Sequence, residues 1–277
     1  MFQGRSLVIG TMHHKEQVIA PVIASAIGVN CYTPSAFNTD ILGTFSGEIE
    51  RKLDPVETVK QKCLKAMDSM GFDLGIASEG SFGPHPTIPF FQADDEWLIF
   101  IDRKNDIEIL VRELSLETNF QGREVGTSEE LDDFLGGVKF PQHAVMVRSL
   151  EPPFEWIKGI QHREDLNKAI LKLNKANGPF WIETDMRAMH NPTRMAVIEK
   201  AAQKLVKAIL STCPSCSKPG FVVISDRQGL PCELCGFPTQ SVIAHIYGCK
   251  SCHFKKEVSF PFGKKNEDPM YCQRCNP

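Results

Sequence analysis

Long apolar runs are missing from this sequence of 277 residues. A helix that crosses a bilayer needs about 20 consecutive apolar residues, and no stretch here approaches that length. The first ten residues contain one Arg and a short apolar stretch at 7–10, which is far shorter than the core of a signal peptide. We therefore expect a cytoplasmic protein with no membrane partner.

Tryptophan, tyrosine and net charge are also scarce. The chain has three Trp, three Tyr and a formal net charge of −3. From residue 211 onward eight Lys/Arg face five Asp/Glu, whereas residues 1–210 carry 23 and 29. Because RNA-binding surfaces combine basic patches with stacking aromatics, this composition weakens a nucleic-acid function.

Cysteine, in contrast, is concentrated near the C-terminal end. Eight of the ten cysteines form Cys-x-x-Cys pairs, namely Cys213, Cys216, Cys232, Cys235, Cys249, Cys252, Cys272 and Cys275. This spacing lets two thiolates reach one metal from a tight turn, and the distances between the pairs are typical of zinc ribbons. Disulfides would need an oxidising compartment, for which the sequence offers no sign. The pattern predicts two structural zinc ions, each held by four thiolates.

The pairing of these motifs is left open by their spacing. Sequential pairing, first with second and third with fourth, is favoured over interleaved pairing. Residues 221–224 and 241–247 read as strands between the motifs. Because such a segment has little apolar core, the metal is expected to supply much of its folding free energy.

Residues 1–210 alternate strand-like and helix-like patterns. This favours an α/β domain with a mixed sheet flanked by helices, followed by a zinc-ribbon module at 211–277. Strands are expected at 6–10, 73–77, 97–102, 107–114, 144–147 and 180–183, with helices at 14–27, 54–71, 127–135, 163–175 and 191–210. Two helix starts are well marked: Asp54-Pro55 is a cap followed by a first-turn proline, and Thr127–Glu130 is a capping box.

Two polar segments in the first part of the chain could bind phosphate and metal. Residues 10–16 turn from a strand into a helix, where backbone N–H groups and Lys15 could cradle a phosphate. Residues 38–48 contain Asp40 and Glu48, which could hold Mg²⁺. An ordinary helix cap and an ordinary surface loop are the alternative interpretations.

A third polar segment, 77–86, follows a predicted strand. Ligands of open α/β sheets bind at the carboxyl ends of strands, and here two glycines and two prolines predict an irregular loop around Ser78, Glu79, Ser81 and His85. Of the four segments, this one points most strongly to function.

The fourth segment, 183–194, also leaves a strand and enters a helix. Its Asp185, Arg187 and Arg194 could form a phosphate clamp, because Arg grips phosphate with two parallel hydrogen bonds. A self-satisfied network of ion pairs is the alternative.

In the order of these segments, the sequence resembles an uncharacterised bacterial domain-of-unknown-function family with a C-terminal zinc region. The resemblance is carried by residues 11–16, 39–48, 78–86 and 183–188 together with the cysteine pairs. It extends over nearly the whole chain and implies no activity.

Residues 7–80 are more distantly similar to the inosine/xanthosine triphosphate pyrophosphatases. The resemblance places Thr11, His13 and Lys15 in the phosphate loop, and Glu79-Gly80 at an acidic turn that holds magnesium. In this resemblance, Gly43-Thr44-Phe45 and Glu48 match the family's Gly-x-Thr-Phe-x-Glu segment. Lys62 or Lys65, together with Ala66, matches a Lys-Ala pair on the helix that follows. The sequence departs from the family where His13 replaces an Asn, Lys15 falls one place early, and one acid replaces a pair.

Two hypotheses follow from these segments. In the first, the protein is a Mg²⁺-dependent phosphohydrolase acting on a nucleotide or another phosphorylated small molecule, with Lys15, Glu48, Glu79, Asp185 and Arg187 as catalytic residues. Thr11, His13, Asp40, Ser78, Ser81, His85 and Arg194 would then bind the substrate. In the second, the protein is a non-catalytic module that binds a ligand, nucleic acid or a protein through its zinc ribbon.

Overall fold

A computed structural model describes residues 1–35, 54–173 and 178–277. The chain forms two compact units, one of residues 1–106 and 110–206, the other of residues 107–109 and 207–277. Within the described ranges, no helix has both the length and the apolar character needed to cross a membrane.

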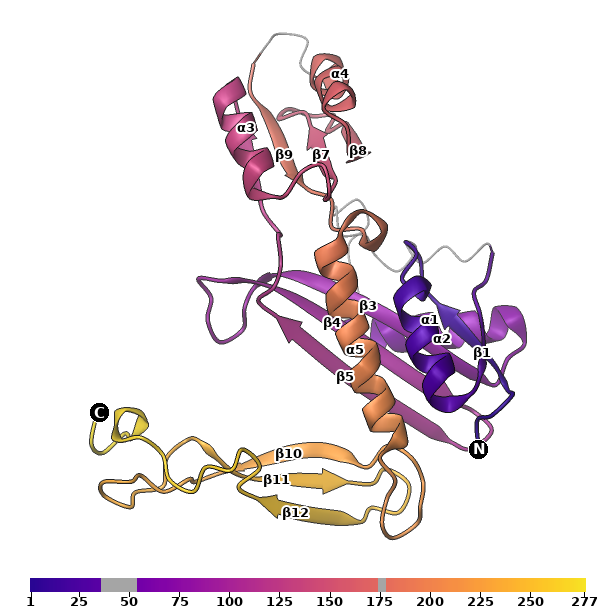
Figure 1. Ribbon diagram of the computed structural model, residues 1–277, viewed down its shortest axis with the longest axis vertical. Helices are drawn as coiled ribbons and strands as arrows, with labels where there is room; N and C mark the ends of the chain where they lie inside the picture. Colours follow the sequence, from indigo (N-terminus) through magenta and orange to yellow (C-terminus); the bar gives the residue numbers. More distant parts are fainter. Residues whose placement is uncertain (36–53, 174–177) are drawn as a thin grey trace. The chain divides into compact units, whose positions relative to one another are not determined.

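A five-stranded mixed sheet in the order β2-β1-β3-β4-β5 organises the first unit (Figure 1). β1 runs parallel to both β2 and β3, whereas β3 and β4 are antiparallel. The strands are β1 (Ser6–Gly10), β2 (Asn30–Tyr32), β3 (Leu74–Pro84), β4 (Gln92–Asp102) and β5 (Ile107–Ser115). The mixed sheet flanked by helices is confirmed.

Helices cover both faces of this sheet (Figure 1). α2 (Pro55–Met70) buries Val59, Ala66 and Met67 against β1, β3 and β4, whereas α1 (Glu16–Ile27) and α5 (Pro192–Leu210) lie on the other face. α2 begins where the carboxylate of Asp54 accepts hydrogen bonds from two backbone N–H groups. The predicted cap of this helix is therefore confirmed.

The long β3–β4 hairpin corrects one expectation. Residues 77–86 were expected to form an irregular loop, but β3 continues to Pro84 and pairs with β4 along its whole length. The polar residues of this stretch can stay in a strand because successive side chains alternate between the two faces of the sheet, where each finds different neighbours.

A second sheet, antiparallel and four-stranded, lies in the same unit in the order β6-β9-β7-β8. Its strands are β6 (Gly122–Val125), β7 (Val145–Arg148), β8 (Trp156–Ile160) and β9 (Phe180–Thr184). α3 (Ser128–Gly137) and α4 (Arg163–Leu173) pack on one face, and the predicted capping box of α3 is present. The sequence predicts only β7 and β9, because β6 and β8 are short and contain polar residues.

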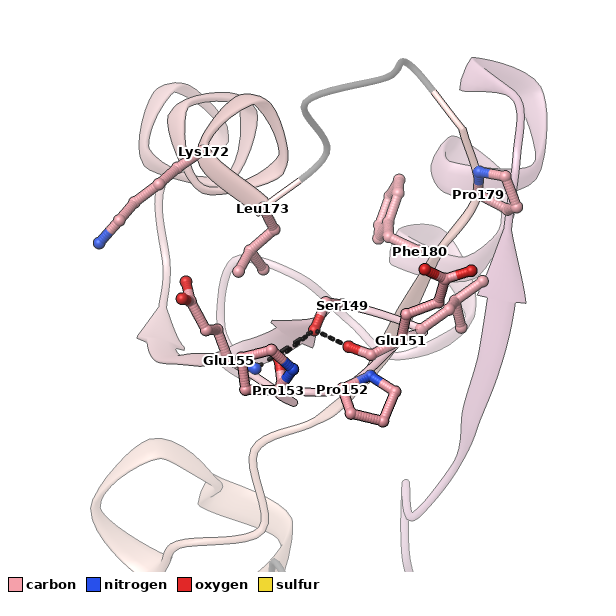
Figure 2. Close-up of a pocket in the computed structure, with 10 residues that line it drawn as sticks. Ser149, Glu151, Pro152, Pro153, Glu155, Lys172, Leu173, Pro179 and Phe180 are labelled. Atoms are coloured by element: carbon pink, nitrogen blue, oxygen red, sulfur yellow. Dashed lines mark hydrogen bonds between the residues drawn. The ribbon is translucent and has the colours of Figure 1, made fainter.

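Beside this sheet, the loop between β7 and β8 lines a cavity of about 450 Å³ (Figure 2). Prolines and apolar side chains form much of its wall, together with Glu151, Glu155 and Lys172. The hydroxyl of Ser149 donates to carbonyls of its own loop and accepts from the Glu155 N–H. The cavity contains none of the residues that the sequence predicted as a site.

The second unit is built on a three-stranded antiparallel sheet, β10-β11-β12. The strands β10 (Val222–Gln228), β11 (Val242–Gly248) and β12 (Lys255–Ser259) follow one another along the chain and pair in that order. Because each strand reverses the direction of the chain, successive connections lie at opposite ends of the sheet.

Candidate functional site

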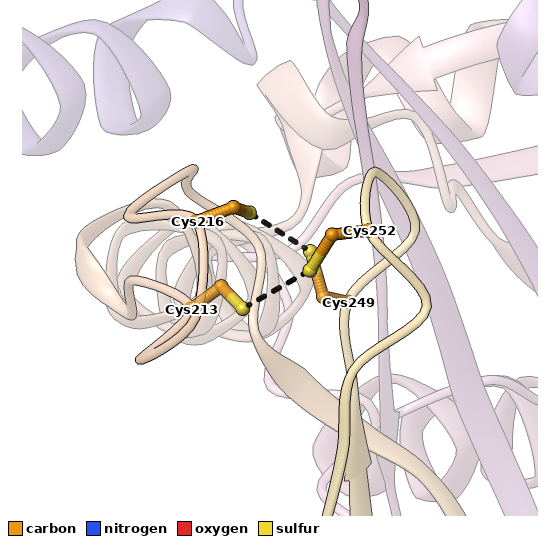
Figure 3. Close-up of side chains that lie close together, drawn as sticks. All are labelled: Cys213, Cys216, Cys249 and Cys252. Carbon is orange, nitrogen blue, oxygen red and sulfur yellow. Dashed lines mark hydrogen bonds between the residues drawn. The ribbon is translucent and has the colours of Figure 1, made fainter.

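The eight paired cysteines form two clusters at the ends of the ribbon sheet. Cys213, Cys216, Cys249 and Cys252 form the first cluster (Figure 3), and Cys232, Cys235, Cys272 and Cys275 form the second. Sulfur atoms from different pairs lie 3.6 Å apart at two places in the first cluster, and 3.7 and 3.9 Å apart in the second. A tetrahedral zinc ion with Zn–S bonds of about 2.3 Å separates its sulfurs by about 3.8 Å. Each cluster could therefore hold a zinc ion.

The turns that carry these cysteines repeat one hydrogen-bond pattern. The N–H of the residue after the second cysteine donates to the carbonyl of the first, at Ser217, Gly236, His253 and Asn276. Three of these residues, Ser217, Gly236 and His253, have a left-handed φ between 60° and 71°. This backbone closes a tight turn, which points both thiolates to the same side.

The clusters correct the expected pairing. The first Cys-x-x-Cys pair joins the third, and the second joins the fourth, so the pairing is interleaved rather than sequential. The interleaving follows from the antiparallel order of the strands. The first and third pairs flank one end of β10, β11 and β12, whereas the second and fourth pairs flank the other end. Each intervening strand carries the chain from one site to the other.

In the first unit, a buried cluster of charged side chains joins β4 to the starts of α1 and α5. The Arg194 Nε donates to a carboxylate oxygen of Glu96 over 2.7 Å, and the Lys15 Nζ lies 3.6 Å from the other oxygen. Burial, followed by the charge of Arg194, lowers the pKa of Lys15 to about 8. Burial alone would raise the pKa of Glu96, but Arg194 and Lys15 hold it below its ordinary value.

Gly80 makes room for this ion pair. It lies opposite Glu96 in the β3–β4 register, and a Cβ atom at position 80 would come within 2.3 Å of Glu96 Oε1 and 2.6 Å of Arg194 Nη2. Neither buried side chain can retreat into solvent, so the close approach requires glycine.

Asp94 is the least satisfied group of the cluster. It lies two residues before Glu96 on β4, so both side chains project from the same face. Neither of its carboxylate oxygens has a hydrogen-bond partner in the described part of the chain. Burial, followed by the charge of Glu96, raises the pKa of Asp94 to about 8. A buried carboxyl without partners is costly unless a cation or an ordered donor binds it.

Glu79 projects from the opposite face of β3 and contacts Lys62 of α2. The charges of Glu79 and Lys62 both act on the pKa of Lys15, which Glu79 raises and Lys62 lowers. The two carboxylate sites are therefore close enough to interact electrostatically through Lys15.

The turn between β1 and α1 brings a neutral imidazole to the same region. His13 and His14 have φ values of 64° and 61°, and two consecutive non-glycine residues in this conformation are uncommon and strained. Burial, followed by the charges of Lys15 and Arg187, lowers the pKa of His13 to about 4. His13 is therefore neutral at pH 7 and lies among cationic side chains.

Asp185 holds Arg187 in place beside His13. Its carboxylate accepts hydrogen bonds from the Arg187 backbone N–H and guanidinium and from the Gly159 N–H over 2.6–3.2 Å. Asp185 is fully buried, whereas 28% of the Arg187 side chain is exposed. Arg187 can therefore meet a ligand while Asp185 orients it.

The remaining predicted residues lie in different settings. The Thr11 hydroxyl donates to the adjacent Met12 carbonyl, and Ser78 is buried with a hydroxyl that has no hydrogen-bond partner among the described residues. Ser81 lies on β3, and the His85 Nδ1 accepts N–H groups within the hairpin turn. Asp40 and Glu48 lie outside the described residues.

The sequence interpretation missed two acids of the cluster, Asp94 and Glu96. A signal for them exists, because acids two residues apart in a strand share one face, and the run 94–96 directly precedes the apolar run that marked β4. Asp95, between them, faces the other way and pairs with Arg112.

Comparison with known proteins assigns the chain to a family. A family model described as "Domain of unknown function (DUF6671)" matches residues 62–277. The chain belongs to this family. The expected membership in an uncharacterised domain family is therefore confirmed.

Two further comparisons add little to the family assignment. Among solved structures, the chain is similar to protein VC0702 from Vibrio cholerae at 11% identity and a TM-score of 0.34, over 75% of this chain and 96% of that one. No curated protein matches it. The likeness of residues 7–80 to inosine/xanthosine triphosphate pyrophosphatases stays a prediction.

Proposed function

We propose that this protein is a Mg²⁺-dependent phosphohydrolase that acts on a nucleotide or another phosphorylated small molecule, with two structural zinc ions in its ribbon. The observation that supports the activity most is the buried Asp94 carboxyl without hydrogen-bond partners among the described residues, beside Glu96 and Lys15. In a purely structural network nearly every buried polar group is hydrogen-bonded, so an unpaired buried carboxyl is better explained as a ligand of a bound cation.

The two acids on β4 supply the oxygens that such a cation prefers. The two carboxylate oxygens of Asp94 are buried without hydrogen-bond partners in the described ranges, and the neighbouring Glu96 Oε2 lies 3.6 Å from the Lys15 Nζ. Magnesium binds few protein carboxylates and takes its other ligands from water and phosphate. Bound there, it would polarise a phosphoryl oxygen and activate water. Glu79, held by Lys62 on the opposite face of β3, would act on the site through its negative charge near Lys15.

Cationic side chains from two segments would neutralise the phosphate. Lys15 is buried beside Glu96, and Arg187 is partly exposed and oriented by Asp185. The neutral His13, whose pKa is lowered by burial and by the charges of both, can donate or accept a hydrogen bond without adding charge. Arg194 is fully buried against Glu96, so it positions that carboxylate rather than reaching the ligand.

The zinc ribbon favours a structural role over nucleic-acid binding. Residues 211–277 contain eight basic and five acidic side chains. Two Zn²⁺ ions with eight thiolates add a net charge of about −4, which leaves the loaded ribbon slightly negative. A surface that grips a phosphate backbone needs a clear positive excess.

Phosphate release from nucleoside triphosphates and sugar phosphates, with and without Mg²⁺, tests this activity. Asp94→Asn keeps the shape of the side chain but removes the carboxylate that a cation would bind. We expect it to lower metal-dependent turnover at least about 100-fold, because losing a ligand costs more than losing a group that orients one. Glu79→Gln is expected to act in the same direction.

Asp95→Asn is the matched control for Asp94→Asn. Asp95 is the next residue of the same strand but pairs with Arg112 on the opposite face, so this variant should keep its turnover. Thermal unfolding checks that all variants fold. Absence of turnover over the whole panel, together with no thermal shift from Mg²⁺ and phosphates, would rule the activity out.

A further inference from the structure

An aromatic platform lies on the face of the second sheet that α3 and α4 leave uncovered. Val145, Val147 and Ile182 face the helices, so Arg148 and Trp181 face the other way. In the strand register, Arg148 lies directly opposite both Trp156 and Trp181. Its guanidinium carbon lies 5.5 and 5.2 Å from the centroids of their rings.

Two further contacts complete this platform. The Phe154 centroid lies 5.1 Å from the Arg148 guanidinium carbon, and the Lys158 Nζ lies 5.8 Å from the Trp156 centroid. The Trp181 Nε1 donates to Glu183 over 2.8 Å, which fixes the orientation of its indole. Arg148, Trp156 and Trp181 are only half-buried. A guanidinium held against fixed indole rings is a surface on which a planar ring can stack.

The platform is connected to the charged cluster along β9. Trp181 and Glu183 share one face of β9, and Asp185, which orients Arg187, follows directly after the strand, so the three lead from the indole toward Arg187. At about 3.3 Å per residue this row is about 13 Å long, which suits an extended nucleotide. Arg148, Lys158 and Asp185 all influence the pKa of Glu183, which burial raises.

We infer that this platform, formed by Arg148, Trp156 and Trp181, is the subsite for a nucleobase, so that the substrate of the charged cluster is a nucleotide. The inference rests on the proposed function for its phosphate end. A single base is favoured over a strand of RNA because the row between the two ends contains the acids Glu183 and Asp185. A groove that follows a nucleic-acid backbone would carry basic residues there.

Binding measured by calorimetry in the presence of Mg²⁺ tests the subsite separately from turnover. The probes are the four common nucleoside triphosphates, the matching nucleosides and inorganic tripolyphosphate. We expect at least one nucleoside triphosphate to bind about tenfold or more tightly than tripolyphosphate, because stacking of a base adds affinity that phosphate contacts do not supply.

Variants of the platform should lower the affinity for nucleoside triphosphates but not the affinity for tripolyphosphate, which has no base. Arg148→Ala and Trp156→Ala are expected to weaken nucleoside triphosphate binding about tenfold and to leave tripolyphosphate binding unchanged. Trp156→Phe keeps an aromatic face and should restore most of the affinity. Phe90→Ala is the control, because Phe90 is an aromatic residue of the same unit that is 93% exposed in the β3–β4 hairpin.

The outcomes separate this inference from the proposed function. Equal affinities for nucleoside triphosphates and tripolyphosphate, or equal weakening of both by the platform variants, would overturn the base subsite and leave the phosphate site intact. Nucleosides that bind and lose affinity in Trp156→Ala, without any tripolyphosphate binding, would support the platform and overturn the proposed activity. No binding of any probe would overturn both.

Discussion

The two candidate sites of this protein are built in opposite ways. The zinc clusters use one kind of ligand in a repeated local turn, and all eight cysteines lie between residues 213 and 275. The charged cluster of the first unit uses different side chains from His13 to Arg194, on separate strands and helices. The comparison shows that a local sequence motif is enough to predict a metal site. The residues of the charged cluster, in contrast, come together only when distant segments fold.

The same contrast holds for what stabilises each unit. The buried apolar cluster of the ribbon consists of Phe221 with Cys213 and Cys249, and every residue of β12 is exposed. In the first unit, whole helix faces pack on both sheets. We therefore expect the ribbon to depend on a bound metal for folding, whereas apolar burial stabilises the first unit.

Removal of zinc is expected to have the largest effect and to separate the two units. A chelator should unfold residues 207–277 and leave the first unit folded, because zinc binding contributes on the order of 10–16 kcal/mol to such small domains. The chelator should remove two zinc ions per chain. In an NMR spectrum, only the amide signals of the ribbon should then lose their chemical-shift dispersion. Dispersed ribbon signals after complete zinc loss would show that apolar packing alone folds it.

Paired cysteine substitutions test the interleaved arrangement. Cys213→Ser with Cys249→Ser changes one cluster, so about one zinc ion should remain, because an intact four-thiolate site does not need its neighbour. Cys213→Ser with Cys232→Ser changes both clusters and should leave no fully liganded site. Native mass spectrometry counts the ions. The reverse pattern would restore sequential pairing.

In the first unit, Gly80→Ala probes the buried ion pair. The new Cβ would lie within 2.3 Å of Glu96 Oε1, and we expect a loss of about 1–3 kcal/mol in the free energy of unfolding from this overpacking. Gly83→Ala is the matched control, because nothing lies within 4 Å of a Cβ at that position of the same strand. Urea unfolding measures both, and equal midpoints would contradict the tight packing around Gly80.

The smallest expected effect is a pH dependence that arises from His13. Its pKa is about 4 in the folded protein and about 6.5 in the unfolded chain. The unfolded state therefore binds more protons between these values, so His13 lowers stability as pH falls from 6.5 to 4. His13→Asn, which tolerates the left-handed φ, should reduce this loss by about 1–2 kcal/mol in denaturant unfolding at pH 5 relative to pH 7. An unchanged pH profile would contradict the burial of a neutral imidazole.

Much of the fold was predictable from local signals. The cap at Asp54 and the capping box at Thr127 mark helices that begin there in the structure, because these side chains satisfy backbone groups of their own turn. The second sheet was not predictable in the same way. β6 and β8 are defined by pairing with β9 and β7, and that pairing is a long-range interaction.

The pairing of the cysteine motifs illustrates a missed inference. The strands expected at 221–224 and 241–247 overlap β10 and β11. A single strand between successive motifs moves the chain from one end of the sheet to the other. That alternation places the first and third motifs together, so the strand count was more informative than the spacing between the pairs.

The sequence by itself determined the metal-binding character of the C-terminal region, the mixed α/β class and the main helix boundaries, because each depends on residues close together in the chain. Only the tertiary structure decided which acids lie beside Lys15. It also decided that Arg148 meets two indole rings from neighbouring strands. These are contacts between distant segments, set by strand pairing and helix packing, and no local pattern encodes them.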